Sequence, residues 1–145
     1  MEKEISLKDL NQIAQDLINK SQKAKSGNAV VIALSGDLGS GKTTLSQQIG
    51  KALGIEENLV SPTFVIMKRY ELDNQAFKNL IHIDAYRLKN ADELIKIGWQ
   101  EIYSNKDNLI IIEWPEMVEG LIPSNAIKVK LSHINENTRH IICES

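Results

Sequence analysis

The sequence predicts an α/β fold in a single domain, residues 1–145, on three observations. An apolar, β-rich run at residues 29–34 is followed by a glycine-rich loop and then by apolar residues at helical spacing. A second run, at residues 109–112, has four apolar residues in succession, which is typical of a central parallel strand buried on both faces. Residues 127–134 and 139–143 alternate around a polar turn and predict a closing hairpin.

The composition is that of an ordinary globular protein, with 42% hydrophobic and 25% charged residues in a chain of 145. The net charge is −2, whereas a protein that binds nucleic acid by itself is expected to be basic. The chain begins with polar residues, and its longest apolar runs fall far short of the roughly 20 residues of a membrane span. We therefore expect a cytoplasmic protein without a membrane segment. Cys143 is the single cysteine, so no internal disulfide can form.

The first predicted helix begins after Ser6, whose hydroxyl can cap it, and packs on a sheet. Its apolar residues at helical spacing are Leu7, Leu10, Ile13, Ala14, Leu17 and Ile18. Residues 20–28 are a polar connector to the first strand, and the helix after the glycine loop ends near Gly54.

The middle of the chain predicts two strands and two short helices. Residues 64–72 and 80–86 are β-rich and are expected to pair antiparallel around a polar turn. Residues 91–97 predict a short helix that ends at Gly98, and residues 99–103 predict a further helical turn.

Residues 36–43 fit the P-loop pattern of glycine, four residues, and Gly-Lys-Ser/Thr, with a strand before it and a helix after it. The glycines let backbone N–H groups converge on one hollow at the positive end of a helix dipole. Lys42 would reach the outer phosphates of a nucleotide and the Thr43 hydroxyl would coordinate Mg²⁺. The alternative is a glycine turn that only joins a strand to a helix. The predicted nucleotide-binding residues here are Gly36, Asp37, Leu38, Gly39, Ser40, Gly41, Lys42, Thr43 and Thr44.

Glu113 resembles a Walker B acid, because it ends an apolar strand at the edge where ligands bind in open α/β sheets. Mg²⁺ prefers one or two carboxylates together with phosphate oxygens. The alternative is a solvated acid at a strand end. The more usual residue in that position is aspartate, so Glu113 is a mild departure from the general pattern.

His82, Asp84 and Tyr86 would lie on one face of a strand by period-two alternation. Asp84 could orient or deprotonate an attacking water, or bind magnesium through water, and Arg87 could neutralise phosphate charge. The alternative is a polar strand face with an ion pair.

Residues 61–63, Ser-Pro-Thr, form either a switch-like segment whose hydroxyl senses the γ-phosphate or a simple proline turn. Trp99 and Trp114 pack in the core or lie at a partner surface, and the core is the prediction for each.

Five motifs occur in order along the chain. They are Gly-Asp-Leu-Gly-Ser-Gly-Lys-Thr-Thr at 36–44, Ser-Pro-Thr-Phe at 61–64, His-Ile-Asp-Ala-Tyr-Arg at 82–87, Ile-Gly-Trp at 97–99 and Ile-Glu-Trp-Pro at 112–115. Together they resemble the bacterial TsaE (YjeE) family, the ATPase of tRNA threonylcarbamoyladenosine biosynthesis. The P-loop is shared by many families, whereas the other motifs are more specific.

The resemblance implies a P-loop ATPase with a central sheet of mixed parallel and antiparallel strands flanked by helices. Its partners would be homologues of TsaB and of TsaD, which transfers the threonylcarbamoyl group to adenosine 37 of tRNAs reading codons that start with A. The ATPase would be weak alone and would meet tRNA only through the complex. By itself it would be a monomer or self-associate weakly.

The resemblance also implies roles for residues. Thr43 and Glu113 would hold Mg²⁺, while Asp84, Lys42 and Thr63 would serve hydrolysis of ATP to ADP, with Thr63 in the switch-like segment. The adenine would lie between the start of the first helix and the C-terminal hairpin, near Ser6, Leu7 and Arg139.

Two other classes of function remain open. One is a small-molecule P-loop kinase, against which stands the lack of an obvious arginine-rich lid segment. The other is a nucleotide-gated binding module without meaningful turnover, in which ATP only sets the shape.

Overall fold

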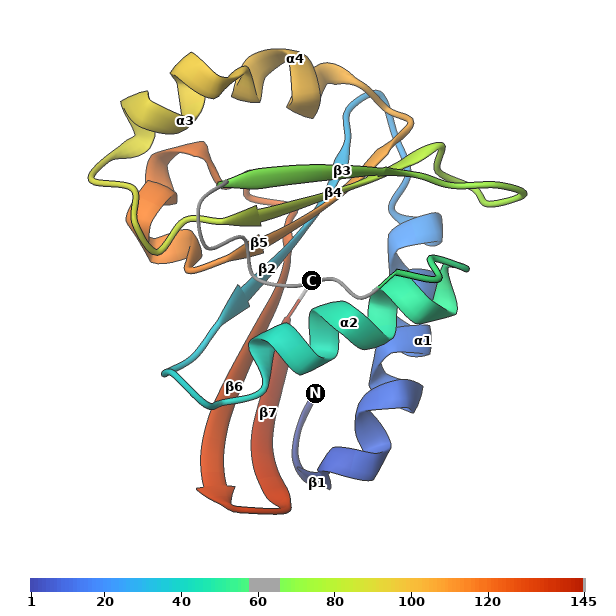
Figure 1. Ribbon diagram of the computed structural model, residues 1–145, viewed down its shortest axis with the longest axis vertical. Coiled ribbons are helices and arrows are strands. Elements are labelled where there is room, and N and C mark those ends of the chain that lie inside the picture. Colours follow the sequence, from blue (N-terminus) through green and yellow to red (C-terminus); the bar gives the residue numbers. More distant parts are fainter. Residues whose placement is uncertain (58–65, 145) are drawn as a thin grey trace.

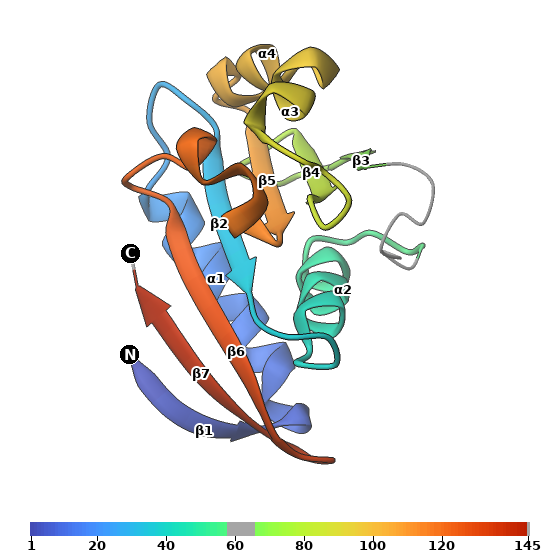
Figure 2. The same cartoon turned by 90° about the vertical axis from the view of Figure 1, so that its left-hand side faces the viewer.

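The computed structural model describes residues 1–57 and 66–144, in which helices flank a seven-stranded sheet (Figures 1 and 2). In spatial order the strands are β1 (Glu2–Ser6), β7 (Thr138–Glu144), β6 (Ile127–Asn135), β2 (Val30–Ser35), β5 (Asn108–Glu113), β4 (Asn79–Asp84) and β3 (Met67–Glu71). The helices are α1 (Leu10–Lys23), α2 (Lys42–Ala52), α3 (Ala91–Ile97) and α4 (Trp99–Ser104), with 3₁₀ turns η1 (Leu7–Asp9) and η2 (Pro115–Leu121).

The sheet has a parallel centre and antiparallel edges. The four strands β6, β2, β5 and β4 run parallel to one another. At the edges, β3 runs antiparallel to β4, β7 runs antiparallel to β6, and β1 runs antiparallel to β7. Every residue of β5 is buried, as expected for a strand covered on both faces. The predicted mixed α/β fold is therefore confirmed, and so are the central strand and the closing hairpin.

Helices cover both faces of the sheet, and the sheet separates the two halves of the hydrophobic core. Figure 1 shows α1 and α2 on one side of the central strands and α3 and α4 on the other. Because side chains alternate along a strand, Leu109 and Ile111 join the core under α1 and α2, while Ile110 and Ile112 join the core under α3 and α4. The next residue, Glu113, continues the alternation and belongs to the α2 face, where it contacts Thr43 and Ser46.

The start of the chain differs from the prediction. Residues 2–6 form an edge strand that pairs with β7, although Ile5 is the one buried residue among them. A single 3₁₀ turn then separates Ser6 from α1, and the Ser6 hydroxyl and N–H both donate to the Asp9 carboxylate, at 3.2 and 2.9 Å. The strand was missed because an edge strand covered on one face needs few apolar residues.

The α3 helix follows the prediction, with residues 91–97 preceded by Asn90, whose side chain accepts the Glu93 N–H, and followed by Gly98 in the left-handed region. The predicted strands at residues 64–72 and 80–86 are shorter in the structure: β3 begins at Met67 and β4 ends at Asp84. Residues 64 and 65 lie outside the described residues. The η2 turn was not predicted.

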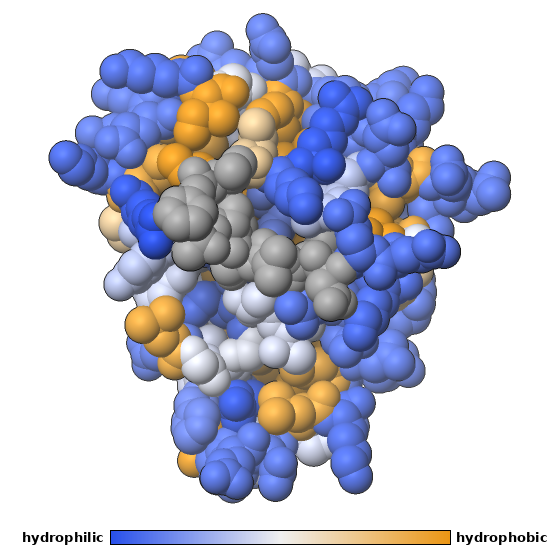
Figure 3. Space-filling view, viewed as in Figure 1, coloured by the Kyte–Doolittle hydropathy of each residue, from blue (hydrophilic) through white to orange (hydrophobic). Residues whose placement is uncertain are grey.

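Figure 3 shows a mostly hydrophilic face with separate apolar patches. Among the described residues, no helix has both the length and the apolar character needed to span a membrane. The domain boundaries and the cytoplasmic location stay predictions.

Candidate functional site

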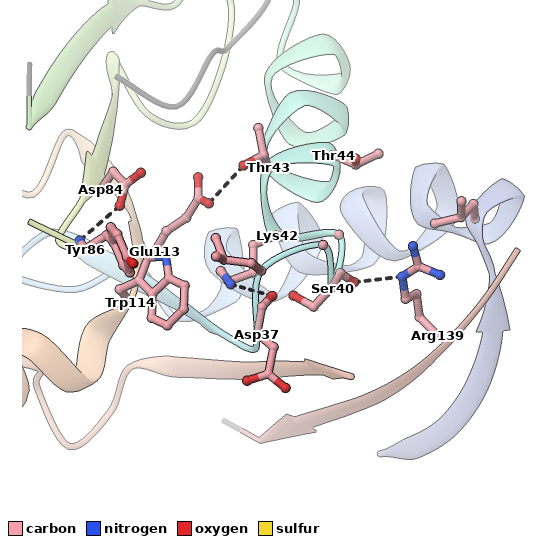
Figure 4. Close-up of a pocket in the computed structure, with 14 residues that line it drawn as sticks. Asp37, Ser40, Lys42, Thr43, Thr44, Asp84, Tyr86, Glu113, Trp114 and Arg139 are labelled. Carbon is pink, nitrogen blue, oxygen red and sulfur yellow. Dashed lines mark hydrogen bonds between the residues drawn. The ribbon is translucent and has the colours of Figure 1, made fainter. Parts of the chain in front are cut away.

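The polar residues predicted to carry chemistry converge at the carboxyl edge of the parallel strands. Residues 36–41 connect β2 to α2, Glu113 ends β5, and Asp84 ends β4. Parallel strands end at the same edge, which is where ligands bind in open α/β sheets. A cavity of about 330 Å³ opens there (Figure 4). Its lining residues are Leu7, Asp37, Leu38, Gly39, Ser40, Gly41, Lys42, Thr43, Thr44, Asp84, Tyr86, Glu113, Trp114 and Arg139.

The loop at residues 36–41 has a backbone shape that requires glycine. Gly36 has φ of +142°, and a Cβ there would lie 2.3 Å from the carbonyl oxygen of Leu131 in β6. Gly41 has φ of +106°. Its carbonyl accepts the Leu45 N–H at 2.8 Å, a hydrogen bond of the first turn of α2. The first N–H groups of such a helix lack intrahelical partners, so they are donors for an anion.

Lys42 is buried inside this loop. Its Nζ donates to the carbonyl oxygens of Gly36 and Asp37, the latter at 3.0 Å, and lies 4.1 Å from the centre of the Trp114 ring. Burial lowers the pKa of Lys42, and the surrounding carboxylates, Glu113 foremost, oppose that lowering. The ammonium is thus held at the cavity by two neutral carbonyl acceptors and one aromatic face.

Glu113 is 2% exposed, so the alternative of a solvated acid at a strand end is wrong. Its Oε1 accepts the Thr43 hydroxyl at 3.2 Å. Its Oε2 lies 2.5 Å from His82 Nε2 and 3.4 Å from the Ser46 hydroxyl. The sequence predicted that Thr43 and Glu113 meet, and they do, but it did not predict the contacts of Oε2.

Asp84 lies opposite Glu113 in the β4–β5 pairing and also faces the cavity. Its Oδ1 accepts the Tyr86 N–H at 3.0 Å, which fixes the carboxylate at the strand end. The prediction that His82, Asp84 and Tyr86 share one strand face is corrected by this geometry. His82 and Asp84 share it, but β4 has ended before Tyr86, which is 51% exposed on the following turn.

Trp114 corrects the prediction of a core tryptophan. It is half-buried at the cavity, with φ of +61°, and its ring lies 4.9 Å from that of Tyr86 and against the Lys42 ammonium. Trp99 is buried in the core as predicted. An aromatic residue directly after an acid at the carboxyl end of a central strand is the signal that points to the cavity wall.

Arg139, one of the residues predicted near the adenine, lies at the far end of the cavity from Trp114 (Figure 4). Arg139 Nε donates to the Ser40 carbonyl at 3.1 Å, and its Nη1 donates to the Asn135 and Thr138 carbonyls. Leu7 also lines the cavity, whereas Ser6 is bound to Asp9 and is not a lining residue. The adenine position stays a prediction, and the role of Arg139 in holding the loop was not foreseen.

Thr63, together with Ser61 and Pro62, lies outside the described residues. Its catalytic role stays a prediction.

The fold and this edge of the sheet define an α/β protein with a mixed sheet and a P-loop sequence between β2 and α2. The family model described as threonylcarbamoyl adenosine biosynthesis protein TsaE matches residues 5–141. The chain belongs to the TsaE family, as the resemblance of its motifs predicted.

Individual relatives agree. A Haemophilus influenzae protein named tRNA threonylcarbamoyladenosine biosynthesis protein TsaE is 35% identical over 79% of this chain and 70% of its own length. A Bacillus subtilis protein of the same name is 33% identical over 81% of this chain and 70% of its own length. The crystal structure of YdiB from Bacillus subtilis has the same fold, with a TM-score of 0.66 at 24% identity over 99% of this chain and 86% of that one.

Proposed function

We propose that this protein binds ATP with Mg²⁺, hydrolyses it slowly, and uses that cycle to support threonylcarbamoyladenosine formation in tRNA. The observation that carries the proposal is the meeting of Lys42, Thr43 and Glu113 at the glycine loop, in one cavity. Family membership supports the pathway, because the relatives carry its name.

Phosphate binding would rest on the loop and on Lys42. The N–H groups at the start of α2 would donate to the phosphates, and the helix dipole favours negative charge at that end of the helix. Lys42 would exchange the Gly36 and Asp37 carbonyls for phosphate oxygens. A charge-assisted bond is stronger than a bond to a neutral carbonyl, which favours the exchange.

The donor set suits magnesium. Mg²⁺ takes oxygen ligands and is held through one or two carboxylates plus substrate phosphates. The Thr43 hydroxyl and the Glu113 Oε1, 3.2 Å apart, supply one hydroxyl and one carboxylate beside the loop. When bound there, the ion would neutralise charge on the phosphate oxygens.

Asp84 is the residue suited to position the attacking water. Its carboxylate is fixed by the Tyr86 N–H and faces the same cavity as Lys42. The water oxygen would bond to the γ-phosphorus as the bond to the bridging oxygen breaks, which yields ADP and phosphate. Asp84 would hold the water in line and Lys42 would offset the charge on the departing oxygens.

The ATP cycle would act on TsaB and TsaD homologues. The net charge of −2 disfavours direct binding to tRNA, so tRNA would be met through the complex. Activating partners speed other P-loop enzymes by positioning water and charge, and the same is expected here.

The test measures phosphate release by the protein alone and with the TsaB–TsaD complex, together with modified tRNA per mole of enzyme. We expect slow release alone, clear acceleration by the partners, and loss of multiple-turnover modification when this protein is left out. An unchanged rate with the partners, together with modification that cycles normally without this protein, would contradict the assignment.

A further inference from the structure

Behind the cavity lies a buried polar cluster formed by His82, Ser46 and the Glu113 carboxylate. His82 and Ser46 are both fully buried, and neither lines the cavity. His82 follows Leu80 and Ile81 and precedes Ile83 in β4, and all three of these neighbours are buried and apolar. A polar side chain in such a place lowers stability unless it is hydrogen-bonded, so its one close polar contact is informative.

That contact divides the two oxygens of Glu113 between two environments. Oε2 faces the interior, at 2.5 Å from His82 Nε2 and 3.4 Å from Ser46 Oγ. Oε1 faces the cavity and accepts the Thr43 hydroxyl at 3.2 Å. The partners of Oε2 therefore determine which oxygen, and which direction of its lone pairs, Glu113 presents to a ligand.

The His82 imidazole contacts the Glu113 carboxylate through one of its two ring nitrogens, Nε2. Within residues 1–57 and 66–144, His82 Nδ1 has no hydrogen-bond partner. Because an ionised carboxylate oxygen can only accept, Nε2–H is the donor in the contact with Oε2. Because Glu113 also lies close to the Lys42 ammonium, an unheld carboxylate would be free to turn toward that charge and away from Thr43.

We propose that His82, assisted by Ser46, is a positioning residue that fixes the Glu113 carboxylate so that Oε1 faces the cation beside Thr43. The inference rests on the proposed function, in which Thr43 and Glu113 hold Mg²⁺. Partners that orient a ligating carboxylate are worth about 10- to 100-fold in metal affinity in other proteins.

The experiment compares two amides at one position. In His82→Gln the side-chain amide reaches about as far as Nε2 and can still donate to Oε2, whereas in His82→Asn it is too short. A non-hydrolysable ATP analogue is titrated against each protein at a series of Mg²⁺ concentrations and without Mg²⁺. We expect His82→Asn to raise the Mg²⁺ concentration for half-maximal binding roughly 10- to 100-fold and His82→Gln to raise it only a few-fold. Metal-free nucleotide affinity should stay within about threefold in both.

The chain offers a matched control. His140 Nε2 makes a similar contact with the Glu2 carboxylate, at 3.0 Å, on the partly exposed β7–β1 edge. His140→Asn should leave the Mg²⁺ dependence unchanged. If His82→Asn does not fold, Ser46→Ala takes its place, with a smaller increase of a few-fold expected because its bond to Oε2 is longer.

The outcomes separate the inference from the function on which it rests. If the unmodified protein binds the analogue without any effect of Mg²⁺, the proposed metal role of Glu113 fails. If the unmodified protein depends on Mg²⁺ and His82→Asn, or Ser46→Ala in its place, has the same Mg²⁺ dependence, the positioning role is wrong and the proposed function stands. A loss of metal-free affinity as large as the Mg²⁺ effect would also overturn the inference, because it would mark general damage to the loop.

Discussion

The two faces of the central strands β4 and β5 carry different chemistry. Toward α3 and α4, the alternate residues Ile81, Ile83, Ile110 and Ile112 are all apolar and buried. The residues that face α1 and α2 are leucine or isoleucine near the amino end of each strand and polar near its carboxyl end. Along β4 and β5 these residues are Leu80, His82, Asp84, Leu109, Ile111 and Glu113.

This difference shows that adjacent residues of one strand can have different roles, one in stability and the other in the site. The α3–α4 face stabilises the fold along its whole length. The α1–α2 face does so only at the amino ends of the strands, and its carboxyl ends meet the glycine loop and α2. We therefore expect substitutions one residue apart to affect different properties.

The largest effect should come from Ile112→Ala, on the apolar face. Removing a fully buried isoleucine side chain to alanine costs about 2–5 kcal/mol of unfolding free energy, because it leaves a cavity. Chemical denaturation measures this loss. Nucleotide affinity of the folded fraction should stay within a few-fold.

Glu113, the residue after Ile112, should affect binding more than stability. Glu113→Gln keeps the volume of the side chain and should change stability much less than Ile112→Ala does, while weakening Mg²⁺-dependent nucleotide binding. If the two substitutions alter stability and binding in the same proportion, the separation of the two faces is wrong.

A smaller effect is expected for Lys42→Ala. It would remove the proposed charge-assisted contact with phosphate, and such contacts are worth about 1.5–3 kcal/mol. ATP affinity or turnover should therefore fall roughly 10- to 100-fold, since about 1.4 kcal/mol is one factor of ten. Lys51→Ala, at an exposed position of the same helix, is the control. Binding and hydrolysis that survive Lys42→Ala unchanged would disprove the phosphate role of the loop.

Asp84→Asn should separate binding from hydrolysis. A residue that positions water acts in the transition state more than in the ground state, so turnover should drop while ATP affinity stays within a few-fold. Steady-state phosphate release and equilibrium binding measure the two. The exposed turn residue Asp73 supplies the control, Asp73→Asn. A collapse of affinity with intact turnover of bound nucleotide would make Asp84 a binding residue.

The sequence predicted the features that rest on local signals. Motif spacing and strand pattern indicated the glycine loop and the acid that ends β5 in the site, and capping residues indicated the limits of α3 in the fold. Contacts between distant segments were predicted only where a motif implied them, as for Thr43 with Glu113. The 2.5 Å approach of His82 to Glu113 needs β4 beside β5 in one register, and the hold of Arg139 on Ser40 joins residues 99 positions apart.

Two local features were also missed, for different reasons. The edge strand β1 has too few apolar residues to show a strand pattern. Trp114 has an apolar side chain, and such residues are core by default, but its left-handed backbone conformation after the strand turns it to the cavity instead.

The central claim is that Thr43 and Glu113 act together on one cation at the carboxyl edge of the sheet, and a double-mutant cycle tests it most directly. Mg²⁺-dependent binding of an ATP analogue is measured for the unmodified protein, Thr43→Val, Glu113→Gln and the double variant. Groups that act as a unit are not additive, so the double variant should lose clearly less affinity than the sum of the two single losses. Losses that add within error would place Glu113 away from the metal and contradict the account.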